Sequence, residues 1–161
     1  MTKEGIRLAT DQYYFNNEPA ADKFDLNETL RTLVHSRQGE CRRQDIAMIL
    51  DLAPELPQAA TDVAQLENVL FALLENTEKA IVGNGDSHGT IIIRTRSNAD
   101  KIQLSISYAG TADAMRRAFE SLQAACAICA QIVQDQGGEL YVWRPRQSGW
   151  TTTVVDVNRL T

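Results

Sequence analysis

Two cysteines at CxxC spacing, Cys126 and Cys129, are the residues whose type and spacing most directly suggest chemistry. Such a pair supports redox exchange, or binds a metal when a second pair or a histidine completes the ligand set. Here it lies in an apolar, helical run without either, and Cys41 leaves an odd number of cysteines. We therefore expect reduced, buried and inert thiols in a reducing compartment.

Two arginine pairs and two tryptophans are the next side chains with binding potential. Arg42-Arg43 and Arg116-Arg117 could hold an acidic partner or a phosphate, but charge pairs at the ends of elements are usually solvated. Trp143 and Trp150 flank the turn Arg144-Pro145-Arg146. We expect them to pack on one another across a final hairpin, and the alternative is an exposed docking patch.

Composition and charge favour one globular domain. A chain of 161 residues, 43% of them hydrophobic, can bury one sizeable core and is too short for two cores to be expected. A net charge of −5 argues against nucleic acid and against an anionic membrane surface as partners. The sequence shows neither a bilayer-spanning apolar run nor, in Met-Thr-Lys-Glu-Gly, the start of a signal peptide. A cytoplasmic protein without direct membrane insertion is expected.

Apolar periodicity predicts the order α β α β β α β β. Helices are expected at 27–39, 61–82 and 112–136, the first ending at Gly39 and the last at Gly137-Gly138. Strands are expected at 46–52, 90–95, 102–106, 140–144 and 151–157. This order predicts an α/β two-layer sandwich, a mixed sheet of about five strands with three helices on one face. The side chains expected in the core are Leu70, Leu73, Leu74, Leu104, Ile106, Ile128 and Ile132.

Five stretches along residues 24–158 resemble one known family. They are Phe24 to Asn27, Leu52 to Pro57, Gln65 to Asn76, Gly89 to Arg96 and Ala127 to Gly138. Together and in this order they resemble the catalytic and ATP-binding domain of bacterial sensor histidine kinases. The resemblance implies the Bergerat, or GHKL, fold for 24–161, with ATP between the helices beneath a flexible lid. Residues 1–23 would be a lead-in segment that resembles the tail of a helical hairpin.

The resemblance also implies which residues would remain of a nucleotide site. Asn76 matches the asparagine that holds magnesium if ATP binds, and Lys79 matches a basic position that contacts phosphate. Their i, i+3 spacing places both on one helical face. Gly110 is the surviving glycine of an Asp-x-Gly-x-Gly loop, and Thr152 on the last strand is carried over as a further remnant.

Elsewhere the family's pattern is lost. Ala72 stands where the family has a second asparagine, or a glutamate base in related hydrolases, and a methyl group supplies neither function. Tyr108 replaces the aspartate that recognises adenine, and Ala112 replaces the second glycine of that loop. The Gly-x-Gly phosphate segment has Gln123 and Ala125 in place of its glycines. About a dozen residues of high helix propensity stand where the lid would be.

Three hypotheses follow. The leading one is a pseudo-kinase domain that needs no cofactor and docks a response regulator, a kinase or a helical hairpin in two-component signalling, without catalysing phosphoryl transfer. The rival is a divergent, active kinase domain that binds Mg-ATP. The third is a histidine phosphotransferase of a phosphorelay, whose carrier histidine lies outside this chain, because His35 and His88 lack the family's acceptor motif and are expected on the surface. A homodimer is left open.

Overall fold

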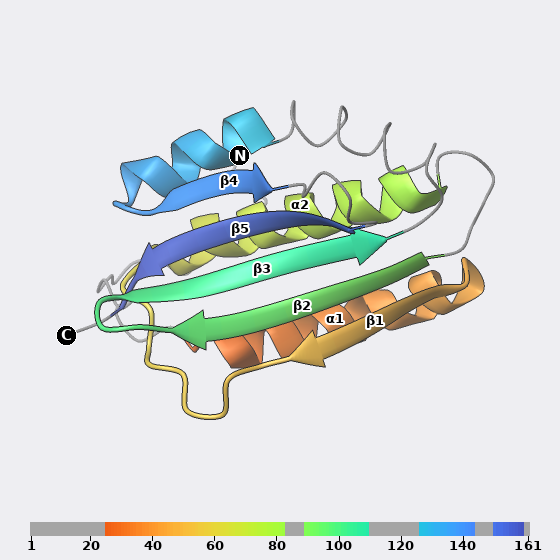
Figure 1. Ribbon diagram of the computed structural model, residues 1–161, viewed down its shortest axis with the longest axis horizontal. Coiled ribbons are helices and arrows are strands. Elements are labelled where there is room, and N and C mark those ends of the chain that lie inside the picture. Colours follow the sequence, from red (N-terminus) through yellow and green to blue (C-terminus); the bar gives the residue numbers. More distant parts are fainter. Residues whose placement is uncertain (1–24, 83–88, 110–125, 144–149, 160–161) are drawn as a thin grey trace, which may run out of the picture.

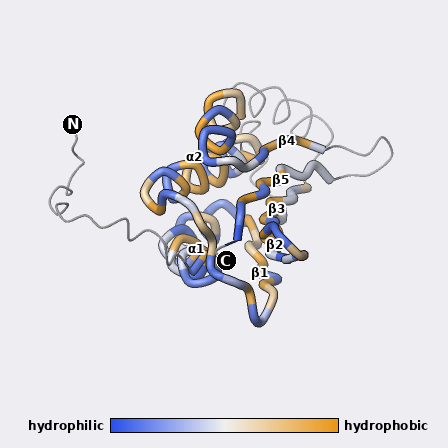
Figure 2. The backbone as a smooth tube through the Cα atoms, turned by 90° about the vertical axis from the view of Figure 1, so that its left-hand side faces the viewer, coloured by the Kyte–Doolittle hydropathy of each residue, from blue (hydrophilic) through white to orange (hydrophobic). Residues whose placement is uncertain are grey.

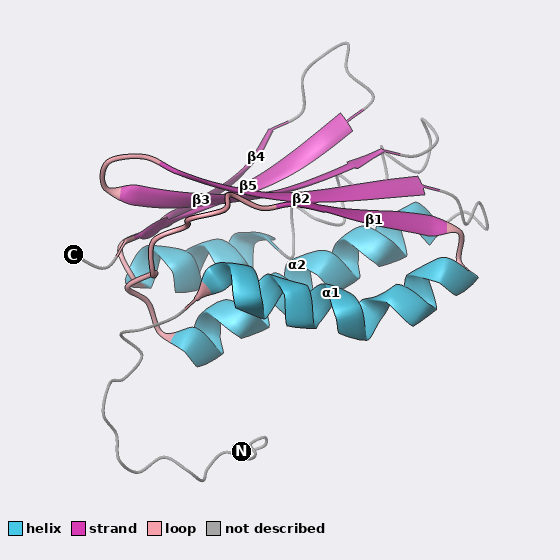
Figure 3. Ribbon diagram, turned by 90° about the horizontal axis from the view of Figure 1, so that it is seen from below, coloured by secondary structure: helices cyan, strands magenta, loops and turns pink. Residues whose placement is uncertain are grey.

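The computed structural model describes residues 25–82, 89–109, 126–143 and 150–159, which form two layers. Helices α1 (Leu26–Arg43) and α2 (Val63–Val82), with a helix over 126–135, cover one face of a five-stranded sheet (Figures 1 and 3). The strands are β1 (Ile46–Asp51), β2 (Gly89–Ser97), β3 (Lys101–Ala109), β4 (Glu139–Trp143) and β5 (Trp150–Asn158). The predicted α/β sandwich is confirmed.

The sheet is mixed, with strand order β1-β2-β3-β5-β4. β1 and β2 are parallel and are joined through α2, whereas the other neighbours are antiparallel. The predicted turn between β2 and β3 is closed by Asn98, whose Oδ1 accepts hydrogen bonds from the backbone N–H groups of Asp100 and Lys101 at 3.2 and 3.0 Å. Asparagine side chains stabilise turns in this way.

Apolar side chains alternate along the strands, so that one face of the sheet packs on the helices. On β3 the residues Ile102, Leu104, Ile106 and Tyr108 are buried on that face. The hydropathy colouring shows apolar segments where the helices approach the sheet (Figure 2). The expected burial of Leu70, Leu73, Leu74, Leu104 and Ile106 is confirmed.

The burial predicted for Ile128 was wrong, because the helix over 126–135 packs a different side against the sheet. Ile128 is 70% exposed, and Ile132 is half-buried against the core. Cys126, Cys129 and Val133 are the buried residues, and their i, i+3, i+7 spacing follows one helical face. This helix ends where predicted, since Gly137 has a φ of +82° that suits glycine.

The expected end of the first helix at Gly39 was also wrong. α1 continues for another turn to Arg43, because Cys41 in that turn is buried in the core. Gly39 faces open space, with nothing within 4 Å of a Cβ placed there. An exposed glycine weakens a helix by only about 1 kcal/mol, which tertiary packing can exceed. The other described helix and strand ends lie within three residues of the predicted ones.

Candidate functional site

The flank of α2 that faces away from α1 carries the predicted magnesium ligand. The opposite flank is defined by Glu78, which accepts two hydrogen bonds from the guanidinium of Arg37 on α1, at 3.1 and 2.5 Å. Asn76 precedes Glu78 by two positions and so lies about 160° around the helix. Ala72, one turn earlier, shares the flank of Asn76. Asn76 and Ala72 therefore lie together on a side of α2 that α1 does not cover.

The carboxamide of Asn76 is engaged by its own helix. Its Nδ2 donates a hydrogen bond to the backbone carbonyl of Ala72 at 2.8 Å. Of the side chains of Asn76 and Ala72, only the carboxamide oxygen of Asn76 could then ligate a cation. Magnesium prefers octahedral oxygen ligation that includes carboxylates or phosphates, and no cluster of His, Cys, Asp or Glu that could hold a metal occurs among the described residues. The described side chains therefore form no metal site by themselves, and a magnesium ion held by Asn76 would need further oxygen ligands.

Lys79 does not join Asn76 in one pocket. It is exposed and lines a hollow between the C-terminal ends of α1 and α2, together with Arg37, Glu40, Gln44, Glu75, Glu78 and Val82. Three of these residues are carboxylates, which suit an ammonium group. The i, i+3 spacing makes Asn76 and Lys79 neighbours on the helix, but Asn76 does not line this hollow.

Tyr108 is built into the core. It is 0% exposed on the helix-facing side of β3, and it pairs in register with Ile91 on β2 and Thr151 on β5. The ring is among the largest fully buried side chains of the described chain. Tyr108 therefore contributes apolar packing between the sheet and the helices. The resemblance places an adenine-binding aspartate at this position.

Thr152 lies on the opposite face of the sheet from Asn76 and Tyr108. Its Oγ1 shares a 2.8 Å hydrogen bond with Oγ of Ser107, and both side chains point away from the helices. The helix-facing threonines of β5 are Thr151 and Thr153, 0% and 1% exposed, whose hydroxyls have no hydrogen-bond partner among the described residues. Alternation counted back from the buried Val155 and Val157 would have identified them from the sequence.

The tryptophans also lie on this outer face. Trp143 is 58% exposed and pairs in register with Thr152, so Trp150 is its diagonal neighbour on the same face. Their mutual packing stays a prediction.

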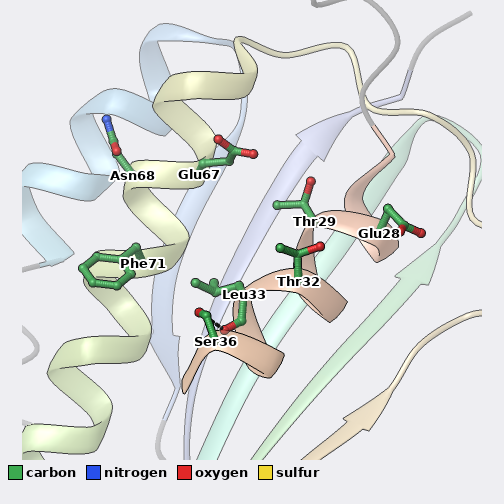
Figure 4. A pocket seen from close by; sticks show the side chains of 8 residues that line it. All are labelled: Glu28, Thr29, Thr32, Leu33, Ser36, Glu67, Asn68 and Phe71. Atoms are coloured by element: carbon green, nitrogen blue, oxygen red, sulfur yellow. Dashed lines mark hydrogen bonds between the residues drawn. The ribbon is translucent and has the colours of Figure 1, made fainter. Parts of the chain in front are cut away.

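A second hollow lies between α1 and α2 on the side away from the sheet. Figure 4 shows the side chains that line it, which are Glu28, Thr29, Thr32, Leu33 and Ser36 on α1 and Glu67, Asn68 and Phe71 on α2. Burial raises the pKa of Glu67. The sequence did not single out this groove.

All three cysteines are buried and unpaired, as expected. Burial raises the pKa of Cys126 to about 11, with a smaller contribution from Cys129, and burial also raises the pKa of Cys41 to about 11. These thiols are therefore protonated and unreactive at neutral pH. His35 and the pair Arg42-Arg43 are exposed, as expected.

Several predicted positions lie outside the described residues. They are the lead-in segment 1–23, His88, Gly110, Ala112, the pair Arg116-Arg117, Gln123 and Ala125. The expectations for them stay predictions. Within the described helices, no segment is long and apolar enough to cross a membrane.

Comparison with solved structures relates this arrangement to a known fold. The nucleotide-free catalytic domain of histidine kinase ThkA superposes with a TM-score of 0.70 at 19% identity, over 85% of this chain and 94% of that one. The chain has the fold of a histidine-kinase catalytic domain. ThkA in complex with the response regulator TrrA gives 0.66 at 17% identity, over 85% of this chain and 41% of that one. Full-length ShkA in complex with AMPPNP superposes with a TM-score of 0.68 at 15% identity, over 86% of this chain and 31% of that one. No family model and no curated protein matches the sequence.

Proposed function

We propose that this chain is a histidine-kinase-like domain that docks a protein partner in two-component signalling and does not use ATP. The observation that carries the proposal is the complete burial of Tyr108 at the position of the adenine-binding aspartate. A ring in that place offers no carboxylate to the adenine amino group. Recognition of a base requires a buried polar group that pairs with it, and without one specificity is lost.

The remaining nucleotide apparatus supports the same proposal. Ala72 contributes a methyl group, and the Nδ2 of Asn76 is bonded to the carbonyl of Ala72. Lys79 lines the hollow on the α1 side, beside three carboxylates. Asn76 is the residue that would hold magnesium if a nucleotide bound, and magnesium would supply charge neutralisation at the phosphates. These groups do not converge on one phosphate position.

The proposed partner is the receiver domain of a response regulator. It is proposed by analogy with ThkA, a protein of the same fold that has been solved in complex with the response regulator TrrA. A helical hairpin or a kinase is an alternative partner of the same signalling class. The retained Asn76, and the AMPPNP complex of ShkA, favour a rival function as an active kinase domain.

Thermal unfolding with Mg-ATP separates the two functions. A ligand present at about 100 times its Kd stabilises the folded state by about 2.7 kcal/mol, which raises Tm by several degrees for a domain of this size. We expect no shift at millimolar Mg-ATP. An active histidine-kinase catalytic domain is the positive control.

A magnesium-dependent rise in Tm that Asn76→Ala abolishes would establish the rival function. In a parallel assay, purified receiver domains are titrated against the immobilised chain, and micromolar binding of at least one is expected. If no receiver domain binds, the docking function is wrong as proposed, whatever the result with ATP.

A further inference from the structure

The groove between α1 and α2, on the side away from the sheet, combines apolar surface with small polar side chains (Figure 4). Its volume of about 380 Å³ lies within the range of binding sites. Phe71 on α2 is 42% exposed, and Leu33 on α1 is half-buried. Thr29, Thr32 and Ser36 give the α1 wall short, uncharged side chains. A partner that covers this groove would therefore remove apolar area from water.

The charge of the groove is negative. Glu28 and Glu67 are among the described residues that line it, and none of those residues is Lys, Arg or His. Glu28 pairs with Arg31 at 3.4 Å. The side chain of Glu67 has no ion pair or hydrogen bond in the described part of the chain, and burial raises the pKa of its carboxyl, although it still reaches water. A cation beside Glu67 would thus be attracted, whereas a carboxylate or phosphate would be repelled.

The shape of the groove suits a helix better than an extended peptide. Its α1 wall runs from Glu28 to Ser36, which is about 12 Å, or about two helical turns. The described residues that line it all belong to helices, so an extended peptide would bury backbone N–H and C=O groups without a strand edge to pair with. A helix satisfies its own backbone and can pack between two other helices.

We propose that the α1–α2 groove docks a helix of a partner protein, which places a lysine or arginine against Glu67 and an apolar side chain, one turn away, against Phe71. The spacing follows from α2, because Glu67 and Phe71 are i, i+4 neighbours about 6 Å apart along the helix axis. The apolar contact supplies most of the affinity, and the charge selects the partner.

This groove is separate from the candidate nucleotide flank. Glu67 lies about 180° around α2 from Asn76, so a helix docked beside Glu67 leaves the flank of Asn76 uncovered. The proposal depends neither on whether the chain binds nucleotide nor on whether its partner is a receiver domain.

Two synthetic helices test the proposal. Each is an alanine-based peptide of about 20 residues, long enough to be helical in water, with glutamine for solubility. One carries lysine and leucine four residues apart on one face, and the other has glutamate in place of each lysine. The peptides are titrated into the isotope-labelled chain and followed by NMR. We expect the lysine peptide to shift the amide signals of residues 28–36 and 67–71, and to bind at least about tenfold more tightly than the glutamate peptide.

Substitutions in the groove should change this preference. Glu67→Lys should reverse it, so that the glutamate peptide binds more tightly. The matched control is Glu139→Lys at an exposed position of β4, which changes the net charge equally and should leave the preference intact. Phe71→Ala should weaken binding of the lysine peptide by at least about fivefold. Tyr141→Ala, which removes a ring of the same 42% exposure from the sheet, should have no effect.

Three results would overturn the proposal. The lysine peptide could leave the groove signals unchanged at millimolar concentration. Glu67→Lys and Glu139→Lys could weaken its binding equally, which would show attraction by the net charge of −5 rather than docking in the groove. Finally, n-butylammonium alone could shift the groove signals as strongly as the peptide at equal concentration, and the groove would then be a site for small organic cations.

Discussion

At the scale of single residues, a buried ion pair joins helices α1 and α2. Glu78 is nearly fully buried, with a side chain 4% exposed, and its two oxygens accept both hydrogen bonds from Arg37. The hydrogen bond to Glu78 raises the pKa of Arg37. Such a pair adds little net stability, but removal of one partner leaves a buried charge without compensation.

Arg37→Ala should therefore destabilise the fold by about 3–5 kcal/mol, measured by urea denaturation. The matched control is Arg43→Ala, since Arg43 pairs with Glu40 in the same helix while 72% exposed. An exposed pair of this kind is worth about 0–1 kcal/mol. Equal effects of the two substitutions would show that Glu78 is hydrated rather than buried.

The buried thiols give a second residue-scale prediction. None of the three cysteines should react with a thiol reagent at neutral pH in the folded protein, and all three should react after unfolding. Because burial raises the pKa of Cys41 and Cys126 to about 11, the folded state holds their protons more tightly than the unfolded state does. Stability should thus fall as pH rises above about 8.5, the unfolded value. Rapid labelling of the native chain would contradict this.

At the scale of elements, apolar periodicity predicts which segments are helices and strands, but neighbouring elements decide where a helix ends and which side it buries. α2 was predicted well because Leu66, Leu70, Leu73 and Leu74 repeat along one face and all are buried. The helix end predicted at Gly39 was wrong because the packing of Cys41, two residues later, outweighs the low helix propensity of glycine. The burial predicted for Ile128 was wrong because, in a short apolar run, the sequence does not decide which side of the helix faces the sheet.

Two glycines test these element-scale forces against each other. Gly39→Ala should stabilise the protein by about 0.5–1 kcal/mol, because the site is helical, exposed and open. Gly138→Ala should destabilise it, because the added Cβ would lie 2.3 Å from the backbone oxygen of Asp156 and 3.0 Å from Val133. Chemical denaturation of both variants measures the two shifts. If Gly39→Ala is destabilising, Gly39 has a role outside helix propensity.

At the scale of the whole molecule, the fold could be predicted from element order and resemblance, whereas the site could be predicted only in part. Asn76 and Ala72 share a flank of α2, as helical spacing requires. Thr152 was carried over by resemblance, but strand alternation turns it to the far face, and Thr151 is the residue beside Tyr108. The exposure of Ile49, Tyr141 and Trp143 on the open face of the sheet was not predictable, because it depends on the described helices lying on the other face.

Tyr108 is fully buried in the core, and the aspartate that the resemblance places at this position should be incompatible with that core. Tyr108→Asp should destabilise the protein by at least about 3–5 kcal/mol, since it removes a buried ring and introduces a carboxylate. It should not restore ATP binding, because Ala72 still supplies no ligand. Burial should raise the pKa of the new carboxyl above its usual value of about 3.9, so this variant should regain stability as pH falls toward about 4. Urea denaturation at two pH values measures both effects.

Tyr108→Phe, which keeps the ring, is the control and should cost no more than about 1.5 kcal/mol of stability. A Tyr108→Asp variant as stable as the unmodified chain would instead reveal a solvated pocket behind the sheet, and with it a place where a nucleotide could still bind.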